Sequence, residues 1–262
     1  MLLKDKRIVL TGAAGGMGAL LANELANAGA QLVLSDLNAD RLNELVARLG
    51  AGHVAVAANL CNAEGRHDLL QACEQLGGVD MLINAAGLSE FVLLENQAAE
   101  RVELMTNINL LVPMLLCQAF LPMLQARSEA AIVNIGSTFG SIGHPGFSTY
   151  CASKFGLRGF TESLRRELAD TSVRVFYIAP RAMRTDMNSA AVVELNNELG
   201  NAMDDPEEVV ASLLNIIGNK TAGAHFLGWP EKLFVRVNGL LPKLVDGALC
   251  KQLATIKRLA VK

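Results

Sequence analysis

The hydrophobic residues of this chain form short apolar runs that alternate with segments in which apolar residues recur at helical spacing. Residues 8–10 make the first run, and apolar residues share one side of the segment 20–28 that follows. Strands that alternate with helices predict an α/β fold on a doubly wound parallel sheet of about seven strands, with helices on both faces. The predicted strands cover 7–10, 31–36, 53–58, 79–83, 131–135, 173–178 and 224–227, and the predicted helices cover about 20–28, 42–49, 62–76, 97–126, 150–169 and 206–218.

Four of the predicted strands end in residues suited to contact a ligand. The first strand runs into the glycine-rich segment 11–18, and others end at Asn84, Ser137 and Pro180. In an open parallel sheet, ligands bind beyond the carboxyl ends of the strands. We therefore expect these four places to lie around one binding cleft.

The segment 11–18, Thr-Gly-Ala-Ala-Gly-Gly-Met-Gly, lies between a predicted strand and a predicted helix, and only that context makes a glycine motif informative. Glycines let the backbone turn tightly and approach a pyrophosphate, whose charge is favoured at a helix N-terminus. Asp36 ends the second strand about 20 residues later, where a carboxylate can accept hydrogen bonds from the hydroxyls of an adenosine ribose. It would repel a 2′-phosphate, and Leu37 offers no basic partner, so the pattern favours NAD over NADP. A structural turn with a helix-capping aspartate is the simpler alternative.

Tyr150 and Lys154 are four residues apart in a predicted helix, a spacing that puts both on one face. A phenol has an ordinary pKa of about 10, and a nearby cation lowers that pKa because it favours the phenolate. The pair therefore suits general acid/base chemistry. Taken alone, such a pair more often belongs to a solvated helix face, so its weight comes from the motifs that precede it.

Composition excludes several classes of protein. Apolar residues make up 51% and charged residues 19% of the 262 residues, which is not the composition of a disordered chain. A net charge of -3 gives no general attraction to nucleic acid. Five cysteines, an odd number without a C-x-x-C pair, favour reduced thiols in a cytoplasmic protein, and we expect no metal site.

Neither a secretory signal nor a membrane span is predicted. Residues 1–7 have no apolar core behind a basic head. The most apolar stretch, 110–124, is interrupted by Pro113 and Gln118 and is shorter than the roughly 18 apolar residues of a spanning helix. We interpret it as a buried helix.

Taken together, the motifs resemble those of the short-chain dehydrogenase/reductase family. They are TGAAGGMG at 11–18, NAAG at 84–87, Asn109 in INLL, Ser137, and YCASK at 150–154, and the resemblance covers roughly residues 4–228. It implies a Rossmann-like fold and an oxidoreductase that transfers a hydride between a nicotinamide cofactor and an alcohol or ketone.

The resemblance also implies roles for individual residues. Tyr150 would be the general acid/base, Lys154 would lower the pKa of Tyr150 and hold the nicotinamide ribose, and Ser137 would orient the substrate oxygen. Asn109, rather than its neighbour Asn107, would help to hold a water that links Lys154 to solvent. Taken singly, each could be an ordinary capping or loop residue. The implied cofactor contacts are Gly12, Gly16, Met17, Gly18, Asp36, Asn59, Leu60, Asn84, Ala85, Gly87 and Thr185, together with Tyr150 and Lys154.

Two positions depart from the family pattern. Arg181 follows Pro180, where the family has glycine, next to the region expected to hold the nicotinamide. It could bind an acidic group of the substrate, bind a cofactor phosphate, or point to solvent. Asn59 replaces the family's usual aspartate near the adenine, which keeps a hydrogen-bonding amide but loses the charge.

The segment after the sixth strand predicts an apolar substrate. Residues 183–205 show an irregular pattern that is rich in Met, Leu and Val, and such a flap is adaptable and apolar. We expect a small hydrophobic secondary alcohol or ketone, for example one with an acyl chain or a steroid-like ring. Packing of a lid against the core is the alternative. The apolar residues are Met183, Met187, Val192, Val193, Leu195, Leu199 and Met203.

A basic amphipathic extension over 229–262 completes a single predicted domain over 1–262. Its leucines have helical spacing, and its carboxylates are Glu231 and Asp246. Such a helix can lie on an anionic membrane surface or pack on a neighbouring subunit, and we favour the subunit. The basic residues are Lys232, Arg236, Lys243, Lys251, Lys257, Arg258 and Lys262.

The sequence thus predicts an NAD-dependent oxidoreductase, and the family resemblance implies a homodimer or homotetramer. Two other functions stay open. A nucleotide-binding scaffold or sensor would keep the fold without turnover, although Ser137, Tyr150 and Lys154 argue against it. An epimerase or dehydratase would need a second acid/base, for which the sequence offers no candidate.

Overall fold

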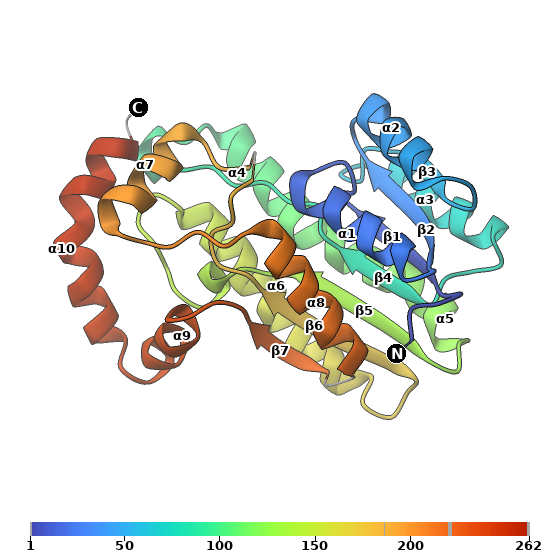
Figure 1. Cartoon of the computed structure of the whole chain (residues 1–262). Helices are drawn as coiled ribbons and strands as arrows, with labels where there is room; N and C mark the ends of the chain where they lie inside the picture. The colour runs from blue at the N-terminus through green and yellow to red at the C-terminus, as the bar shows by residue number, and fades with distance from the viewer. Residues whose placement is uncertain (1, 186, 220–221, 261–262) are drawn as a thin grey trace.

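The computed structural model describes residues 2–185, 187–219 and 222–260. Its strands are β1 (Arg7–Thr11), β2 (Gln31–Asp36), β3 (Val54–Ala57), β4 (Met81–Asn84), β5 (Ala130–Ile135), β6 (Val173–Ala179) and β7 (Gly223–Phe226). They form one seven-stranded sheet in the order β3-β2-β1-β4-β5-β6-β7, and every neighbouring pair is parallel (Figure 1). The predicted fold class is confirmed. The strand order reverses between β1 and β4, so the carboxyl ends of these two strands open a crevice.

Helices cover both faces of the sheet. Apolar residues of α1, α2 and α8 pack on one face, and those of α3, α5 and α6 pack on the other. The helices are α1 (Gly16–Asn27), α2 (Ala39–Leu49), α3 (Ala63–Gln75), α4 (Ala99–Thr106), α5 (Val112–Gln125), α6 (Ser148–Glu167), α7 (Ala190–Leu199), α8 (Pro206–Asn219), α9 (Glu231–Leu240) and α10 (Pro242–Ala260).

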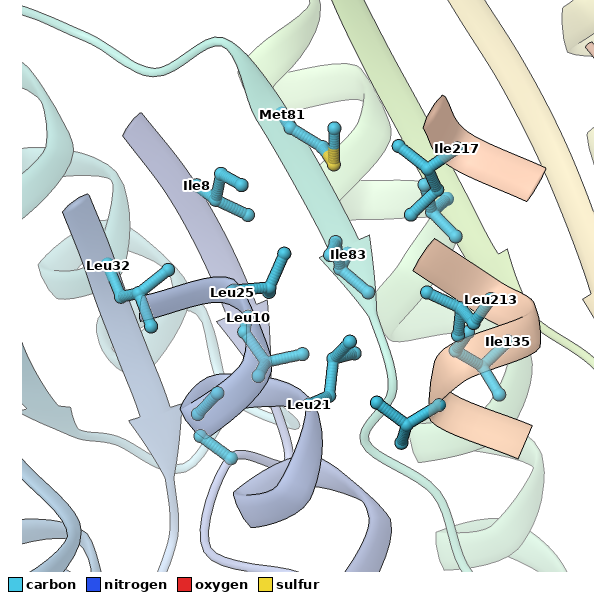
Figure 2. Packing of buried hydrophobic residues seen from close by; sticks show 14 of the residues in the cluster. Ile8, Leu10, Leu21, Leu25, Leu32, Met81, Ile83, Ile135, Leu213 and Ile217 are labelled. Carbon is cyan, nitrogen blue, oxygen red and sulfur yellow. The ribbon is translucent and has the colours of Figure 1, made fainter. Parts of the chain in front are cut away.

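The alternation of apolar residues along β1 places the core on both sides of the sheet. Ile8 and Leu10 pack under α1, while Val9 points to the opposite face, and all three are fully buried. Figure 2 shows Leu21 and Leu25 of α1 directed at these strands. Each such side chain stabilises the fold by roughly 1.5–3 kcal/mol. This packing fixes the strand ends that form the site.

The predicted helix over 97–126 contains an interruption that the sequence reading missed. A π-helical segment, Asn107–Leu111, separates α4 from α5. Pro113 has no N–H to donate to the carbonyl of Asn109 in the α-helical pattern, which favours the wider turn. By length and mean hydropathy (1.6), Ala99–Gln125 could span a membrane. However, Leu116, Phe120 and Leu124 are fully buried against the sheet, as expected of a core helix.

Two other segments differ from the prediction. The expected irregular flap over 183–205 contains α7, which Ser189 caps by accepting a hydrogen bond from the Val192 N–H and which Gly200 ends in the left-handed conformation. The C-terminal extension forms two helices rather than one. They separate at Leu241 because the following Pro242 disfavours a helical residue before it. Lys262, one of the predicted basic residues, lies outside the described residues.

Candidate active site

The glycine-rich turn after β1 folds tightly against the end of β4. Gly12 has a φ of 68°, and a Cβ on it would lie 2.7 Å from the Cα of Ala86. A Cβ on Gly18 would lie 2.0 Å from the carbonyl oxygen of Gly12. Only glycine fits at these two positions, so the loop backbone is brought close to the crevice between β1 and β4.

The N-terminus of α1 is arranged to accept an anion. Its capping residue, Gly15, makes no side-chain cap, and the first turn of the helix carries no acidic residue. The first backbone N–H groups of a helix and its dipole favour negative charge. Gly16 and Thr185 border a cavity of about 350 Å³ at this end, where Arg184 pairs with Asp205 at 3.3 Å and Glu207 also lines the wall. The N–H groups of the helix N-terminus, rather than the charges around this cavity, fit a cofactor pyrophosphate.

Asp36 links the end of β2 to the glycine-rich turn. Its Oδ2 accepts a hydrogen bond from the N–H of Ala14 at 3.0 Å, and its Oδ1 accepts one from the N–H of Asn38 at 3.1 Å. The cap of α2 is Asn38, which accepts from Arg41. The helix-capping alternative is therefore wrong for Asp36. Leu37 beside it is 73% exposed and brings no positive charge to the ribose position.

The side chain of Asn84 serves the sheet. It is buried and donates a hydrogen bond to Asn134 Oδ1 at 2.8 Å, and Asn134 in turn donates to Thr161 Oγ1 at 2.9 Å. This chain of bonds joins β4, β5 and α6. The part of Asn84 left for a cofactor is its backbone, as for the half-buried Ala85 and Gly87 that follow it.

Thr11 is a residue of the crevice to which the sequence assigned no role. Its Oγ1 accepts hydrogen bonds from the backbone N–H groups of Ala85 and Ala86 at 3.1 and 3.2 Å. The bonds hold the end of β1 against the loop that follows β4. The position was visible in the motif TGAAGGMG, but its partners were not.

The remaining predicted cofactor contacts border the same crevice or the core beside it. Asn59 is exposed, and its Oδ1 accepts a hydrogen bond from the N–H of Cys61 at 3.0 Å. Leu60 is buried, and the half-buried Met17 packs on the core under α1. Asn59 follows β3, so it lies at the same carboxyl edge of the sheet as Asp36.

Ser137, Tyr150, Lys154 and Asn109 come together from three parts of the chain. Ser137 hydrogen-bonds the hydroxyl of Tyr150. The Nζ of Lys154 lies 5.8 Å from the ring centre of Tyr150 and donates to the carbonyl of Ile135 at 2.9 Å. Asn109 and Lys154 both lie beside Gly87 of the loop after β4, since a Cβ on Gly87 would lie 3.1 Å from Asn109 Oδ1 and 3.7 Å from Lys154 Nζ.

Asn109 is fully buried in the π-helical segment and is held on both sides. Its Oδ1 accepts from the N–H of Leu88 at 2.8 Å, and its Nδ2 donates to the carbonyl of Leu88 at 2.9 Å and to Ser153 Oγ at 3.1 Å. Ser153 in turn donates to the carbonyl of Tyr150 at 2.7 Å. The preference for Asn109 over Asn107 agrees with this placement beside Lys154.

Burial dominates the protonation of the Tyr150–Lys154 pair. It raises the pKa of Tyr150 to about 12, although the hydrogen bond with Ser137 acts to lower it. It lowers the pKa of Lys154 to about 8. The pKa of Tyr150 thus moves opposite to the expected direction. The Lys154 ammonium is engaged by the carbonyl of Ile135, and its charge does not offset the desolvation of the half-buried Tyr150.

Tyr177 of β6 supports the site from behind, and its spacing gave no signal in the sequence. Its hydroxyl donates toward the backbone carbonyls of Ser137 and Lys154 at 3.1 and 3.4 Å, and accepts from the N–H of Ser137 at 3.3 Å. A Cβ on Gly136 or Gly140 would lie 2.1 Å from its side chain. A buried tyrosine needs such partners, and here they fix two of the candidate catalytic residues.

The expected substrate side is lined by aromatic and aliphatic side chains. Phe147 stacks on Phe91 with ring centres 5.0 Å apart and contacts Tyr150 at 6.4 Å. Phe91 also borders a cavity of about 470 Å³ between the β4–α4 loop, α7 and the end of α10. Val192 of α7 and Leu259 of α10 line its other walls. The flap therefore both packs as a lid and faces a cavity.

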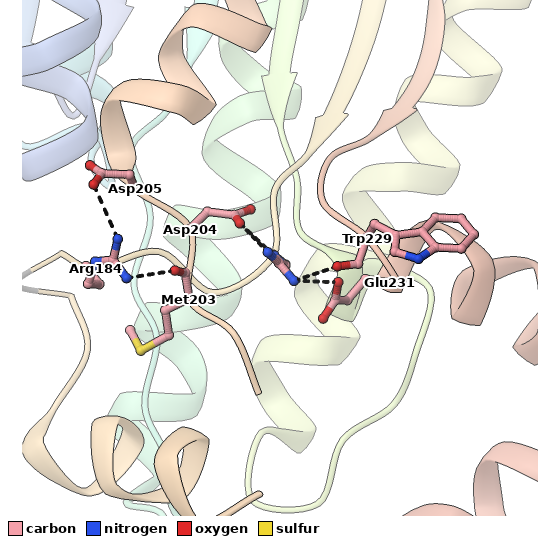
Figure 3. A network of polar contacts seen from close by, with 7 residues as sticks. Arg184, Met203, Asp204, Asp205, Trp229 and Glu231 are labelled. Carbon is pink, nitrogen blue, oxygen red and sulfur yellow. Dashed lines mark hydrogen bonds and ion pairs between the residues drawn. The ribbon is translucent and has the colours of Figure 1, made fainter. Parts of the chain in front are cut away.

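Arg181 binds acidic residues of its own chain, so none of the three expected roles holds. It donates to Asp204 Oδ1 from Nε at 2.8 Å, to Glu231 Oε2 at 3.0 Å and to the carbonyl of Trp229 at 2.9 Å (Figure 3). The side chains of all three charged residues are mostly buried. A Cβ on Gly228 would lie 2.7 Å from Arg181, so glycine makes room for it.

Comparisons with known proteins agree with this geometry. The family model described as short chain dehydrogenase matches residues 6–195. The 3-oxoacyl-[acyl-carrier-protein] reductase FabG of Vibrio cholerae is 31% identical over 245 residues, which are 90% of this chain and 94% of that protein. A short chain dehydrogenase/reductase from Burkholderia phymatum, solved in complex with NAD, has a TM-score of 0.84 at 22% identity and covers 93% of this chain and 96% of its own. A short chain dehydrogenase from Burkholderia cenocepacia, solved in complex with NADP, has a TM-score of 0.81 at 23% identity, with 95% and 99% covered.

Proposed function

The chain belongs to the short-chain dehydrogenase/reductase family and is an oxidoreductase of CH–OH and keto groups, and from that premise we propose that it interconverts a hydrophobic secondary alcohol and its ketone with NAD as the preferred cofactor. One observation carries the proposal. The hydroxyl of Tyr150 hydrogen-bonds Ser137 while the buried Lys154 lies on the same helix face, all at the carboxyl edge that holds the glycine-rich turn.

The side chains of the site divide the work of proton transfer. Tyr150 gives a proton to the ketone oxygen or takes one from the alcohol, and Ser137 orients that oxygen by a hydrogen bond. Lys154 stabilises the phenolate with its charge, and Tyr177 keeps Ser137 and Lys154 in register through their backbones. A bound nicotinamide supplies or accepts the hydride.

The preference for NAD rests on Asp36 and its neighbour. The carboxylate ends β2 beside the glycine-rich turn, and the residue after it is an exposed leucine. A carboxylate favours the two free hydroxyls of an adenosine ribose over a 2′-phosphate. Of the similar solved structures, one is in complex with NAD and another is in complex with NADP, so we infer that the choice depends on such local residues.

The preference for an apolar substrate rests on the cluster around Tyr150. Phe147, Val192, Leu195 and Ile256 are buried together there, with the half-buried Phe91 packed against them. Walls of this kind suit a flexible acyl chain or a flat ring system and offer little to a polar substrate.

The test uses Tyr150→Phe, which keeps the ring and removes the hydroxyl. We expect NADH-linked turnover of hydrophobic ketones to fall by about 10²–10⁴-fold. NADH should still raise the melting temperature of the variant, since ligands that bind the native state stabilise it. If the wild-type protein is stabilised by NADH but turns over none of the hydrophobic alcohols and ketones tested, the scaffold alternative is correct. Equal turnover by the variant and the wild type would contradict the role of Tyr150.

We also propose that two copies pair through the surface of α4, α5 and α6. These elements pack side by side, since Gly156 of α6 lies against Leu110 of the π-helical segment. Their outer surface exposes large apolar residues, which a homodimer would bury. The residues are Leu104, Leu111, Met114 and Phe155, exposed by 37–46%.

A further inference from the structure

Residues 229–244, which we call the C-terminal corner, expose an unusual group of large apolar side chains. The corner comprises Trp229, α9 and the first residues of α10, and it lies at the opposite end of the molecule from β3 and α2 (Figure 1). Exposed apolar residues scattered singly are ordinary, whereas a contiguous group indicates an interaction surface. Within these few residues, six are exposed by between 44% and 81%: Trp229, Leu233, Phe234, Leu240, Leu241 and Leu244.

Helix α9 is apolar on the side away from the protein body. Val235 is buried, and Asn238 donates a hydrogen bond to the carbonyl of Ser141 at 2.8 Å, which defines the inner side. At roughly 100° per residue, Leu233 and Leu240 lie on the opposite side of the helix. Neither leucine belongs to a core cluster of the described residues, so the outer side is available for a contact beyond this chain.

The corner is held firmly in place. Glu231, at the start of α9, pairs with Arg181 at 3.0 Å, and Arg181 also binds the carbonyl of Trp229. The indole of Trp229 extends away from this network (Figure 3) and is 68% exposed. The outer surface is therefore presented by a fixed element of the fold rather than by a loose tail.

The exposed charges of the corner are all positive. Lys232, Arg236 and Lys243 are exposed among the leucines. The carboxylate within 229–244 is Glu231, which Arg181 already neutralises. This basic corner stands out in a chain whose net charge is -3. A complementary surface must be anionic and must also receive apolar side chains.

We propose that the C-terminal corner docks on the surface of an anionic lipid bilayer. The leucines and Phe234 would enter the boundary between head groups and acyl chains, and the cations would face lipid phosphates. Tryptophan favours the membrane–water interface, where the exposed Trp229 would lie. A second copy fits less well, because a two-fold contact through residues 229–244 would bring the three exposed cations of each copy together, while the next carboxylate along the chain, Asp246, lies outside the corner. The proposal does not depend on the proposed reaction.

The test measures co-sedimentation of the full chain with vesicles. One set contains phosphatidylglycerol and phosphatidylcholine in equal parts, and the other contains phosphatidylcholine alone. We expect binding to the anionic set, weakened by salt. Lys232→Gln/Arg236→Gln/Lys243→Gln should weaken that binding on the order of 100-fold, since each cation near an anionic surface contributes roughly a fivefold factor. Leu240→Ser/Leu241→Ser/Leu244→Ser should weaken binding to the anionic set by about tenfold or more.

A matched control carries the same charge change elsewhere. Arg48→Gln/Arg166→Gln/Lys251→Gln removes three exposed cations outside the corner and should bind as the wild type does. Circular dichroism and stabilisation by NADH verify that each variant is folded. The proposal is overturned if the wild type binds neither vesicle, or if the control loses as much affinity as the corner variant. It is also overturned if the leucine variant turns a dimer into a monomer while the wild type ignores vesicles, since the partner is then a second copy.

Discussion

Arg181 donates two hydrogen bonds to Oδ1 of Asp204, from Nε at 2.8 Å and from Nη2 at 2.5 Å. The pair joins the end of β6 to the segment that leads into α8. The same guanidinium reaches Glu231 at 3.0 Å and so ties α9 to both. A residue that departs from the family pattern thus joins the flap and the C-terminal extension.

Arg181→Met should destabilise the protein and weaken substrate binding. It leaves Asp204, whose side chain is 13% exposed, without its cation, and we expect a loss of about 2–4 kcal/mol in the free energy of unfolding. The KM for a hydrophobic ketone should rise more than kcat falls, because the flap loosens while Tyr150 and Lys154 stay in place. Thermal unfolding and steady-state kinetics measure the two effects.

The control for this change is Arg166→Ala. Arg166 forms an exposed pair with Glu162 one turn earlier in α6, and its loss should change stability by less than about 0.5 kcal/mol. If the melting temperature of Arg181→Met lies within a degree of that of this control, the ion pairs of Arg181 do not stabilise the fold.

Ser137→Ala should shift the pH dependence of the reaction upward. The hydrogen bond from Ser137 lowers the pKa of Tyr150, while burial raises it to about 12. Without Ser137 only the raising effect remains, so the pKa of Tyr150 rises. Alcohol oxidation needs the phenolate, and its rate should reach a plateau at higher pH than in the wild type. Ketone reduction needs the phenol and should persist to higher pH.

Profiles of rate against pH, recorded for alcohol oxidation and for ketone reduction, measure this shift. Separately, we expect kcat to fall by about 10²-fold. Ser141→Ala is a suitable control, since the Ser141 hydroxyl accepts from Arg158. A profile for Ser137→Ala that overlays the wild-type profile after scaling would show that Ser137 does not influence the protonation of Tyr150.

Lys154→Met should change how stability depends on pH. Burial lowers the pKa of Lys154 from 10.5 to about 8 in the folded chain. Between these two values the unfolded chain binds the extra proton, so stability rises with pH in that window, and below pH 8 the buried charge costs a constant amount. Between pH 8 and 10.5, the free energy of unfolding of the wild type should therefore rise by about 3 kcal/mol relative to that of Lys154→Met.

Denaturant unfolding at several pH values measures this difference. The raised pKa of Tyr150 makes stability fall above pH 10, but it acts in both proteins and largely cancels. A constant difference in unfolding free energy across the window would show that Lys154 is not buried as a charged group.

The sheet was readable from the sequence because both of its faces are buried. Ile8, Val9 and Leu10 are all apolar, as a parallel strand between two helix layers requires. Each strand end is marked by a change to small or polar residues, which also located the crevice. The Tyr150–Lys154 pair was readable for a similar local reason, since one helical turn fixes their relation whatever surrounds them.

The features that the sequence did not predict depend on contacts between residues far apart in the chain. Arg181 is 23 residues from Asp204 and 50 from Glu231, and nothing local pairs them. Tyr177 lies 40 residues from Ser137. The pKa of Tyr150 was misjudged for the same reason, because the extent of burial decides its direction. Helix α7 was missed because its caps and its packing on α10, rather than a long periodic pattern, specify it.

Asp36→Asn should reduce the preference for NADH over NADPH. The amide keeps an oxygen that can accept from the N–H of Ala14 or Asn38, but it removes the charge that repels a 2′-phosphate. We expect the ratio of kcat/KM for NADPH to that for NADH to rise by about tenfold or more. Asp40→Asn removes an exposed charge in the first turn of α2 and should leave the ratio unchanged. Preference for NADPH in the wild type would contradict the proposed role of Asp36.

Leu111→Glu should separate a homodimer into monomers. Leu111 is 46% exposed in the π-helical segment, and Phe155 of the neighbouring α6 is 43% exposed. A carboxylate in the middle of such a contact would be buried without a partner, which costs several kcal/mol. Light scattering coupled to gel filtration should show a halved mass, while Leu76→Glu, at the end of α3, should keep the wild-type mass. If the wild type is already a monomer, or if Leu111→Glu remains a dimer, the contact does not lie on this surface. If Leu111→Glu remains a dimer but Leu240→Ser/Leu241→Ser/Leu244→Ser is a monomer, the dimer contact lies at the C-terminal corner instead.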